Sequence, residues 1–259
     1  MSATSELTST LDIGRVIREI FSVLGRNFAT FALLAVIMTG VPTAILYGAQ
    51  GAFLTTGDIS AFFGPRLLWA VLGGLVAGVS GLILQAAIIH GTVADLNERP
   101  VSVADGLAAG LRAFLPLFGI AICLSIAVGL GFLLLIVPGV LMALAWCVAV
   151  PSYVIEQRGV FASFERSAEL TRGSRGAIFG LFVLYFVAVL VVELVLGVVG
   201  GITNFITIGG FSPITRLVVM PLIQVIGALI GTTGAAVIYV ELRRIKDGVG
   251  PKGLAAIFD

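Results

Sequence analysis

The sequence predicts an all-α membrane protein: a polytopic bundle of six transmembrane helices with short amphipathic helices at the cytoplasmic interface. Hydrophobic residues make up 59% of the 259 residues and charged residues only 11%, and the mean hydropathy is +1.15. Soluble domains carry about 25% charged residues, which cover their surface, so lipid must solvate most of this chain. Long apolar runs and an uneven distribution of positive charge support the same fold class.

Six apolar runs are predicted to cross the membrane within a single integral membrane domain, residues 1–259. A span needs about 20 mostly apolar residues, because only a helix satisfies its own backbone in hydrocarbon. The first run is interrupted at Gly40-Val41-Pro42, and Pro138-Gly139 predicts a tight hairpin between the third and fourth. The predicted spans are 28–53, 67–90, 114–137, 140–155, 177–202 and 217–240.

Lysine and arginine are distributed unevenly between the connecting segments. Of the 15 such residues, all but Arg66 and Arg216 lie in the N-terminal segment, after an even-numbered span or in the C-terminal segment. Cytoplasmic segments carry an excess of Lys and Arg. We therefore expect a multi-pass protein of the bacterial inner (plasma) membrane with both termini in the cytoplasm. The net charge of +1 does not indicate nucleic-acid binding.

Amphipathic helices are predicted at three places on the cytoplasmic side. In residues 11–26 the apolar side chains form one helical stripe, made of Ile13, Val16, Ile17, Ile20, Phe21 and Leu24. Residues 103–112 and 160–173 repeat this pattern in shorter form. Such a helix lies in the headgroup plane with its arginines near anionic lipid phosphates.

The chain also reads as three copies of one unit: interfacial helix, span, outer loop and span. Each even-numbered span ends on an acidic residue that is soon followed by arginine, namely at Asp95, Glu156 and Glu241. This pattern predicts a pseudo-threefold repeat of helix hairpins, parallel rather than inverted. Close helix packing is predicted at three small-xxx-small pairs, Gly74/Gly78, Gly197/Gly201 and Gly227/Gly231.

Several residues carry a resemblance to a known family. They are Pro138-Gly139, Val150-Pro151, Glu156, Arg166-Ser167, Leu170, Gly173 and the tail from Tyr239 to Gly248. This chain resembles the membrane domain of the glycerophosphoryl diester phosphodiesterase family, as a stand-alone six-helix member without the catalytic domain. The resemblance implies six membrane helices and no settled activity. That family's catalytic barrel binds metal through histidines and carboxylates, whereas this chain has one histidine, His90.

Glu193 is an acidic residue placed well inside a predicted span, where an ionisable group marks a candidate functional site. Arg216, at the start of the sixth span, is positioned to approach it. Gln85 and Gln224 also lie inside spans, where interhelical hydrogen bonding is the usual role. These four residues form the candidate intramembrane polar site, with a transport or proton-binding role and a structural contact as the two alternatives.

The densest charged patch follows the fourth span. Together with the N-terminal arginines it forms a candidate cytoplasmic surface for anionic headgroups or a protein partner, made of Arg15, Arg18, Glu156, Arg158, Arg166, Arg172 and Arg175. The alternative is a solvated, salt-bridged interfacial helix. The sequence contains no catalytic triad, metal cluster, dinucleotide fingerprint or P-loop. We therefore predict no catalytic residue, metal site or cofactor.

These features predict a non-catalytic membrane protein that binds lipid or organises membrane protein complexes. The expected partners are anionic lipid headgroups, with a protein at the cytoplasmic face or a second copy of the chain as further candidates. The alternative function is a small transporter or permease for a lipid-related or amphiphilic substrate. In that case Glu193 is the coupling or recognition group.

Overall fold

The fold is the predicted all-α membrane bundle. The computed structural model describes residues 11–54, 65–206 and 215–248, without the side chains of 48–54, 65–66, 199–206 and 216. In chain order the helices are α1 (Ile13–Arg26), α2 (Phe28–Ala35), the π-helical turn Val36–Gly40, α3 (Val41–Leu54), α4 (Pro65–Leu96), α5 (Val103–Leu134), α6 (Ile136–Trp146), α7 (Ala149–Glu156), α8 (Val160–Thr171), α9 (Arg175–Ile206), the π-helical turn Thr215–Val219 and α10 (Met220–Asp247).

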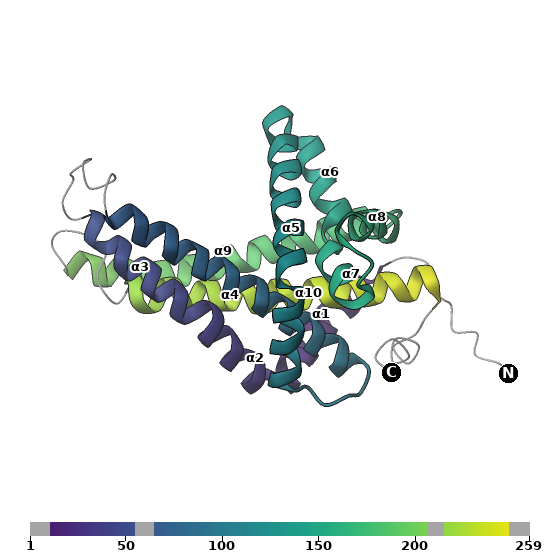
Figure 1. The fold of residues 1–259 in the computed structure, drawn as a ribbon, viewed down its shortest axis with the longest axis horizontal. Helices are drawn as coiled ribbons and strands as arrows, with labels where there is room; N and C mark the ends of the chain where they lie inside the picture. Colours follow the sequence, from purple (N-terminus) through teal and green to yellow (C-terminus); the bar gives the residue numbers. More distant parts are fainter. Residues whose placement is uncertain (1–10, 55–64, 207–214, 249–259) are drawn as a thin grey trace.

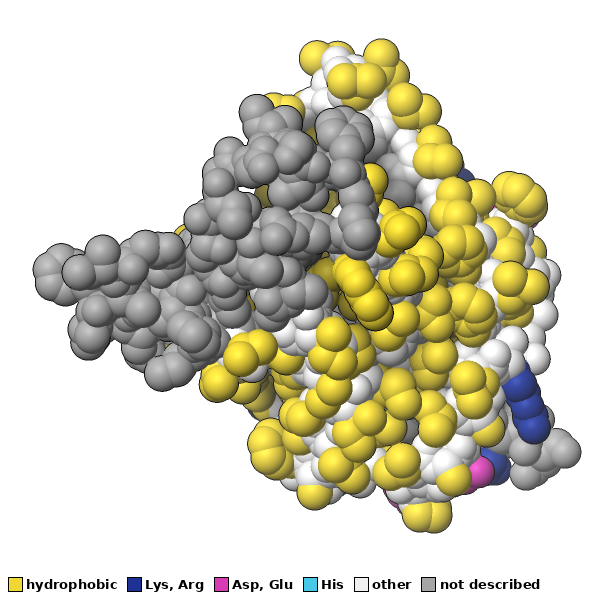
Figure 2. Space-filling view, turned by 60° about the vertical axis from the view of Figure 1, so that its left-hand side comes forward, with side chains coloured by type: hydrophobic (Ala, Val, Ile, Leu, Met, Phe, Trp, Pro, Cys, Tyr) yellow, Lys and Arg dark blue, Asp and Glu magenta, His cyan; other side chains and the backbone are white. Residues whose placement is uncertain are grey.

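Six helical segments in these described ranges are long and apolar enough to cross a membrane. They are Phe28–Tyr47, Leu67–Leu96, Val103–Leu134, Ile136–Glu156, Arg175–Val198 and Leu217–Asp247. Figure 2 shows hydrophobic side chains over most of one face, with the charged side chains gathered at one edge. We call this edge the charged end and define it by α1, α7, α8 and the C-terminal turns of α4 and α10.

The helices run in two directions. Figure 1 shows α3, α4, α9 and α10 lying along the long axis, with the α5–α6 hairpin standing across them. The crossing of α5 over α4 depends on two glycines. A Cβ atom on Gly110 would lie 2.6 Å from the carbonyl oxygen of Ile83, and one on Gly106 would lie 3.3 Å from that of Ala87. Because neither residue has a side chain, the two backbones can touch.

The predicted separate interfacial helix at 103–112 is wrong. These residues form the first turns of α5, which continues without a break into the third span. The helix begins at Ser102, whose Oγ accepts a hydrogen bond from the Asp105 N–H at 3.3 Å, as an N-cap does. No glycine or proline separates Arg112 from Phe114, and Pro116 removes one backbone hydrogen bond without ending the helix.

The predicted hairpin between the third and fourth spans is present, but its turn lies at Leu135, which has extended backbone angles. Pro138 and Gly139 instead occupy the first turn of α6. Proline is tolerated there because the first N–H groups of a helix have no intrahelical partner. A Cβ on Gly131 would lie 2.9 Å from the Cα of Gly139, so this glycine pair lets α5 and α6 meet directly.

The first and last spans each widen into a π-helical turn shortly before a proline. Val36–Gly40 precedes Pro42, and Thr215–Val219 precedes Pro221. Proline removes a backbone hydrogen bond and pushes away the carbonyl four residues earlier, and a π-turn accommodates that change. The interruption predicted at Gly40-Val41-Pro42 is therefore a local widening of a continuous helix.

Most of the buried core lies toward the charged end. The larger cluster joins Val16 of α1, Ile89 of α4, Leu170 of α8 and Tyr239 of α10, all fully buried. A smaller cluster around Phe31 packs α2 against α4 and α10. At the tip of the α5–α6 hairpin, by contrast, Leu133 is 81% exposed. Side-chain packing therefore holds the helices together at the charged end, whereas the exposed apolar surface elsewhere must be covered by lipid.

The three predicted glycine pairs have different surroundings. Gly227 and Gly231 face Tyr185, with its Oη 3.7 and 3.2 Å from the Cβ positions. Gly74 and Gly78 have nothing within 4 Å of theirs, and the same holds for Gly197. Gly201 lies outside the described side chains. Only the Gly227/Gly231 pair is thus seen to pack within the described part of the chain.

Candidate functional site

Asp95 and Glu156 lie at the C-terminal ends of α4 and α7, whereas Glu241 lies six residues before the end of α10. Each of the three contacts an arginine from another helix. The closest contacts are 2.6 Å, 3.2 Å and 4.0 Å for the pairs Asp95–Arg26, Glu156–Arg166 and Glu241–Arg15. A carboxylate near a helix C-terminus is repelled by the helix dipole, and a nearby arginine offsets that repulsion. Asp95 and Glu156 thus share one structural role, whereas Glu241 lies before the last turn of α10, where the helix dipole no longer acts.

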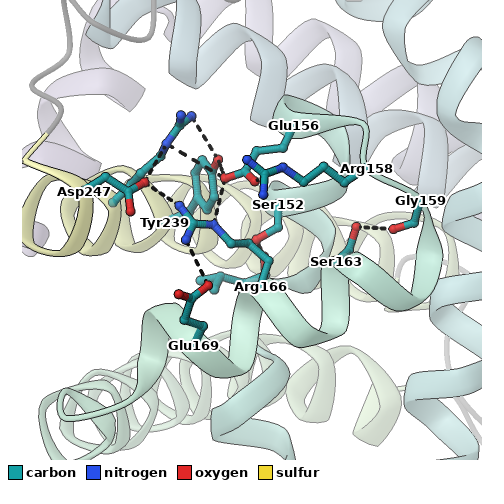
Figure 3. Close-up of polar contacts among 11 residues, drawn as sticks. Ser152, Glu156, Arg158, Gly159, Ser163, Arg166, Glu169, Tyr239 and Asp247 are labelled. Carbon is teal, nitrogen blue, oxygen red and sulfur yellow. Dashed lines mark hydrogen bonds and ion pairs between the residues drawn. The ribbon is translucent and has the colours of Figure 1, made fainter.

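Glu156 is the centre of the largest ion cluster at the charged end (Figure 3). Its side chain is only 4% exposed. Gln157 and Gly159 adopt positive φ and turn the chain from α7 into α8, which brings Arg166 back over Glu156. The Glu156 Oε1 accepts hydrogen bonds from Arg166 Nε at 3.2 Å and from the Tyr239 hydroxyl at 2.8 Å.

The last turns of α10 complete this cluster. Arg166 also donates to Asp247. Arg243 donates to Asp247 at 3.2 Å and to the Tyr239 hydroxyl at 3.4 Å. The cluster therefore joins α7, α8 and α10. Tyr239, Arg243 and Asp247 were not among the predicted site residues, although their spacing of four places them on one face of a helix.

The cluster contains equal numbers of positive and negative side chains, and these side chains bind one another. The carboxylates of Glu156, Glu169 and Asp247 face the guanidinium groups of Arg158, Arg166 and Arg243. Burial disfavours the charge of Arg166, but the hydrogen bond and charge of Glu156, followed by Glu169 and Asp247, outweigh burial and raise its pKa. Arg166 thus stays charged, and its guanidinium N–H groups already donate hydrogen bonds within the protein.

One atom of this cluster lacks a hydrogen bond. The Glu156 Oε2 is buried and accepts none from the described residues. The Nε of Arg158 lies 3.1 Å away, so their charges attract although the geometry of a hydrogen bond is absent. Because the Arg158 side chain is 61% exposed, water and salt screen this contact.

A second polar cluster ties α1 to the end of α4. Arg26 holds both carboxylate oxygens of Asp95, at 2.6 and 3.3 Å, and the side-chain amide of Asn27 donates to Asp95 at 2.7 Å. The hydrogen bond to Asp95 raises the pKa of Arg26. This bidentate contact fixes the direction in which the chain leaves α1 and enters α2.

Replacing Asp95 with asparagine should lower the free energy of unfolding by about 1–2 kcal/mol. A hydrogen bond to a charged group contributes about 1.5–3 kcal/mol, and the 50% exposure of Arg26 reduces that value. Thermal unfolding in detergent micelles measures the effect. Glu98→Gln is the matched control, since Glu98 is exposed and its side chain has no partner among the described residues. Equal midpoints for the two variants would contradict the prediction.

The predicted cytoplasmic-surface residues fall into two groups. Arg15, Arg158 and Arg166 each contact a carboxylate. Arg18 and Arg172 are exposed, and their side chains make no hydrogen bond or ion pair with a described residue. The Nε of half-buried Arg175 likewise has no hydrogen-bond partner. Of this group, the exposed Arg18 and Arg172 are the residues best placed to meet a ligand.

The candidate intramembrane polar residues do not converge in the described part of the chain. Glu193 and Gln224 are exposed and Gln85 is half-buried. Their side chains form no hydrogen bond or ion pair with one another or with any other described residue. The side chain of Arg216 lies outside the described residues. The pairing of Glu193 with Arg216 stays a prediction.

A cavity of about 220 Å³ lies between α1, α9 and α10. This cavity was not predictable from the sequence, because its walls come from segments far apart in the chain. Apart from the Tyr185 hydroxyl and the Cys147 thiol, only apolar side chains and glycines line it. The Tyr185 hydroxyl donates to the carbonyl of Gly227 at 3.3 Å. The lining residues are Ile17, Ile20, Phe21, Cys147, Val148, Leu181, Phe182, Leu184, Tyr185, Ala188, Ile230, Gly231, Gly234, Ala235 and Ile238.

Six long apolar helices, joined at one end by ion pairs, define a multi-pass α-helical membrane protein. In comparisons with known proteins, the chain matches no family model and no solved structure. Within the ranges that the structure describes, no group of three or more His, Cys, Asp or Glu residues could hold a metal ion.

Proposed function

We propose that the protein is a non-catalytic lipid-binding protein of the bacterial inner membrane, with its charged end and both termini in the cytoplasm. The observation that carries this proposal is the outer flank of α1. Phe21 is 63% exposed there, and Arg18, three residues earlier on the same side of the helix, is exposed without an acidic partner among the described residues. An exposed aromatic beside a free arginine is typical of a helix that lies among lipid headgroups.

The other interfacial helix, α8, repeats this combination. Phe161 is 80% exposed, and Arg172, which follows the last residue of α8, is exposed with an unpaired side chain. The buried face of α8 is meanwhile held by the Glu156 cluster. Helices α1 and α8 therefore each combine a fixed inner face with an outer face suited to anionic lipid.

The orientation rests on the excess of lysine and arginine at the charged end, since positive charges are retained in the cytoplasm. Juxtamembrane lysines and arginines are attracted to the anionic lipids of that leaflet by about 1 kcal/mol each. The resemblance to a stand-alone membrane domain of the phosphodiesterase family implies no settled activity, and the absence of the catalytic barrel's histidine set from the sequence supports a role other than that enzyme's.

Replacing both Arg18 and Arg172 with glutamine should reduce the enrichment of anionic lipid around the protein. Each arginine contributes about 1 kcal/mol, so removing one should lower the preference for anionic over neutral lipid about fivefold. The experiment extracts full-length protein directly from membranes of equal phosphatidylglycerol and phosphatidylcholine content into lipid discs, and mass spectrometry measures the retained lipids. Each of the two single variants is measured as well, and Arg158→Gln is their control, because it removes one charge that is already paired with Glu156.

Two results would overturn the proposal. Phosphatidylglycerol enrichment that is the same in the double variant as in the unmodified protein would show that these arginines do not bind lipid. A stoichiometric protein that co-purifies with unmodified protein and is lost from the double variant, with lipid content unchanged, would replace lipid by a protein partner.

A further inference from the structure

We infer that the cavity between α1, α9 and α10 holds one acyl chain of an anionic glycerophospholipid whose phosphate binds Arg18. This inference rests on the proposed function, and it names the class of lipid and the place where the lipid is held. It is carried by the chemistry of the cavity, the position of its opening and the free charge beside that opening.

The cavity suits hydrocarbon better than water. Its walls offer hydrocarbon side chains from three helices, and the polar Tyr185 hydroxyl is already bonded to Gly227. A water held there needs two to four polar partners, whereas the polar groups on the described walls are the bonded Tyr185 hydroxyl and the Cys147 thiol. The cavity is open toward the surface, so a lipid chain can reach it. At about 220 Å³, this cavity has room for a segment of an acyl chain.

Small residues on α10 create this space. Gly231, Gly234 and Ala235 form the α10 wall together with larger apolar side chains. A Cβ on Gly234 would lie 3.5 Å from Ile20 Cδ1 and one on Gly231 would lie 3.2 Å from the Tyr185 hydroxyl. Side chains at these two positions would narrow the slot between α1, α9 and α10.

The cavity reaches the surface beside Arg18. Phe21 lines the cavity yet is 63% exposed, so it stands at the opening. Arg18 precedes Phe21 by three residues and lies on the same flank of α1. The other arginines of α1 are held by carboxylates, Arg15 by Glu241 and Arg26 by Asp95. A lipid whose chain enters beside Phe21 therefore brings its phosphate to a free guanidinium group.

These features favour a phospholipid over a peptide or a polar amphiphile. A peptide inserted into this cavity would leave amide groups without hydrogen bonds, and each such buried group costs about 1–3 kcal/mol. An acyl chain carries no polar group to desolvate. The anionic phosphate in turn pairs with Arg18, with charge-assisted hydrogen bonds to the planar guanidinium.

The test uses full-length protein in vesicles of equal phosphatidylglycerol and phosphatidylcholine content, doped with a phosphatidylglycerol that carries a photoreactive diazirine in one acyl chain. Irradiation followed by mass spectrometry maps the cross-links. We expect labelling at the cavity walls, in residues 181–188 of α9 and 230–238 of α10. The same diazirine chain on phosphatidylcholine should label these walls about fivefold less, the value of one arginine contact.

Ala188→Phe is the variant that blocks the cavity. Ala188 lines it but is itself exposed, so a larger side chain can be placed there without disturbing the buried core. Val187→Phe is the matched control, since Val187 is its exposed neighbour and does not line the cavity. Ala188→Phe should abolish cavity labelling, Val187→Phe should leave it intact, and Arg18→Gln should lower phosphatidylglycerol labelling to the phosphatidylcholine level.

Cavity labelling that is unchanged by Ala188→Phe, or equal for the two lipids, would overturn the inference. The two proposals fail separately. If cavity labelling is absent while phosphatidylglycerol enrichment still depends on Arg18 and Arg172, the lipid binds elsewhere and the proposed function stands. If that enrichment is also independent of the two arginines, both proposals are wrong.

Discussion

Replacing Arg166 with leucine should lower the free energy of unfolding by about 3–5 kcal/mol, the cost of removing one partner from a buried ion pair. Arg166 is 12% exposed and holds Glu156, whose side chain is 4% exposed. Without it, Glu156 keeps a screened contact with Arg158 and a distant one, 3.9 Å, with Arg243. The carboxylate would be left buried with too little positive charge around it.

The measurement is thermal or denaturant unfolding in micelles, with Arg172→Leu as the control. Arg172→Leu makes the same change in net charge and side-chain size as Arg166→Leu. Arg172 follows the end of α8, however, and its side chain is exposed and unpaired among the described residues. We expect a change within about 0.5 kcal/mol for the control, as for most surface substitutions. If both variants unfold at the same temperature or denaturant concentration, the Glu156 cluster does not hold α7, α8 and α10 together.

A double-mutant cycle with Glu156→Gln isolates the pair. Neutralising Glu156 removes the charge that Arg166 compensates, so the loss from Arg166→Leu should be smaller in the Glu156→Gln background. Coupling energies of about 0.5–3 kcal/mol are typical of residues in one network. Additive losses would show that the two side chains act independently.

Replacing Gly110 with alanine should separate α4 from α5. A Cβ there would lie 2.6 Å from the Ile83 carbonyl oxygen, and backbone cannot move aside as a flexible side chain can. Overpacking of this kind costs about 1–3 kcal/mol. The loss outweighs the helix propensity gained from alanine, which is about 1 kcal/mol.

Two further glycines give a graded control, measured by the unfolding midpoint in micelles. At Gly106 the nearest atom to a Cβ is 3.3 Å away, and at Gly78 nothing lies within 4 Å. The destabilisation should therefore be largest for Gly110→Ala and smaller for Gly106→Ala, and Gly78→Ala should stabilise the protein by up to the helix propensity of alanine, about 1 kcal/mol. Equal midpoints across the series would contradict the contact between the α4 and α5 backbones.

The fold class was predictable because lipid solvation acts on composition. A run such as 177–202 has to be helical and in contact with lipid whatever its neighbours are. The continuity of α5 was not predictable in the same way. An apolar stripe in residues 103–112 is equally consistent with a helix that stops before the span and with one that continues into it.

The candidate site was predictable only in part. Glu156 and Arg166 stand out as charges beside apolar runs, yet Asp247, which accepts a hydrogen bond from Arg166, lies 81 residues beyond it. Which arginines are free depends on such distant partners: Arg15 and Arg18 look alike in the sequence, but only Arg15 contacts a carboxylate in the described structure. The cavity likewise exists only once α1, α9 and α10 have packed.

The α5–α6 hairpin has a mechanical consequence. Apart from Gly131 and Gly139, where its two helices meet, the buried residues of the hairpin, among them Leu117 and Ile120, lie nearer its base. The tip from Leu133 to Val137 is 68–81% exposed. A rotation of the hairpin about the Gly110 crossing would therefore displace its exposed tip more than any other part of it. The 24 residues from Gly110 to Leu134 span about 36 Å at 1.5 Å per residue, so a rotation of about 5° at this crossing displaces the tip by about 3 Å.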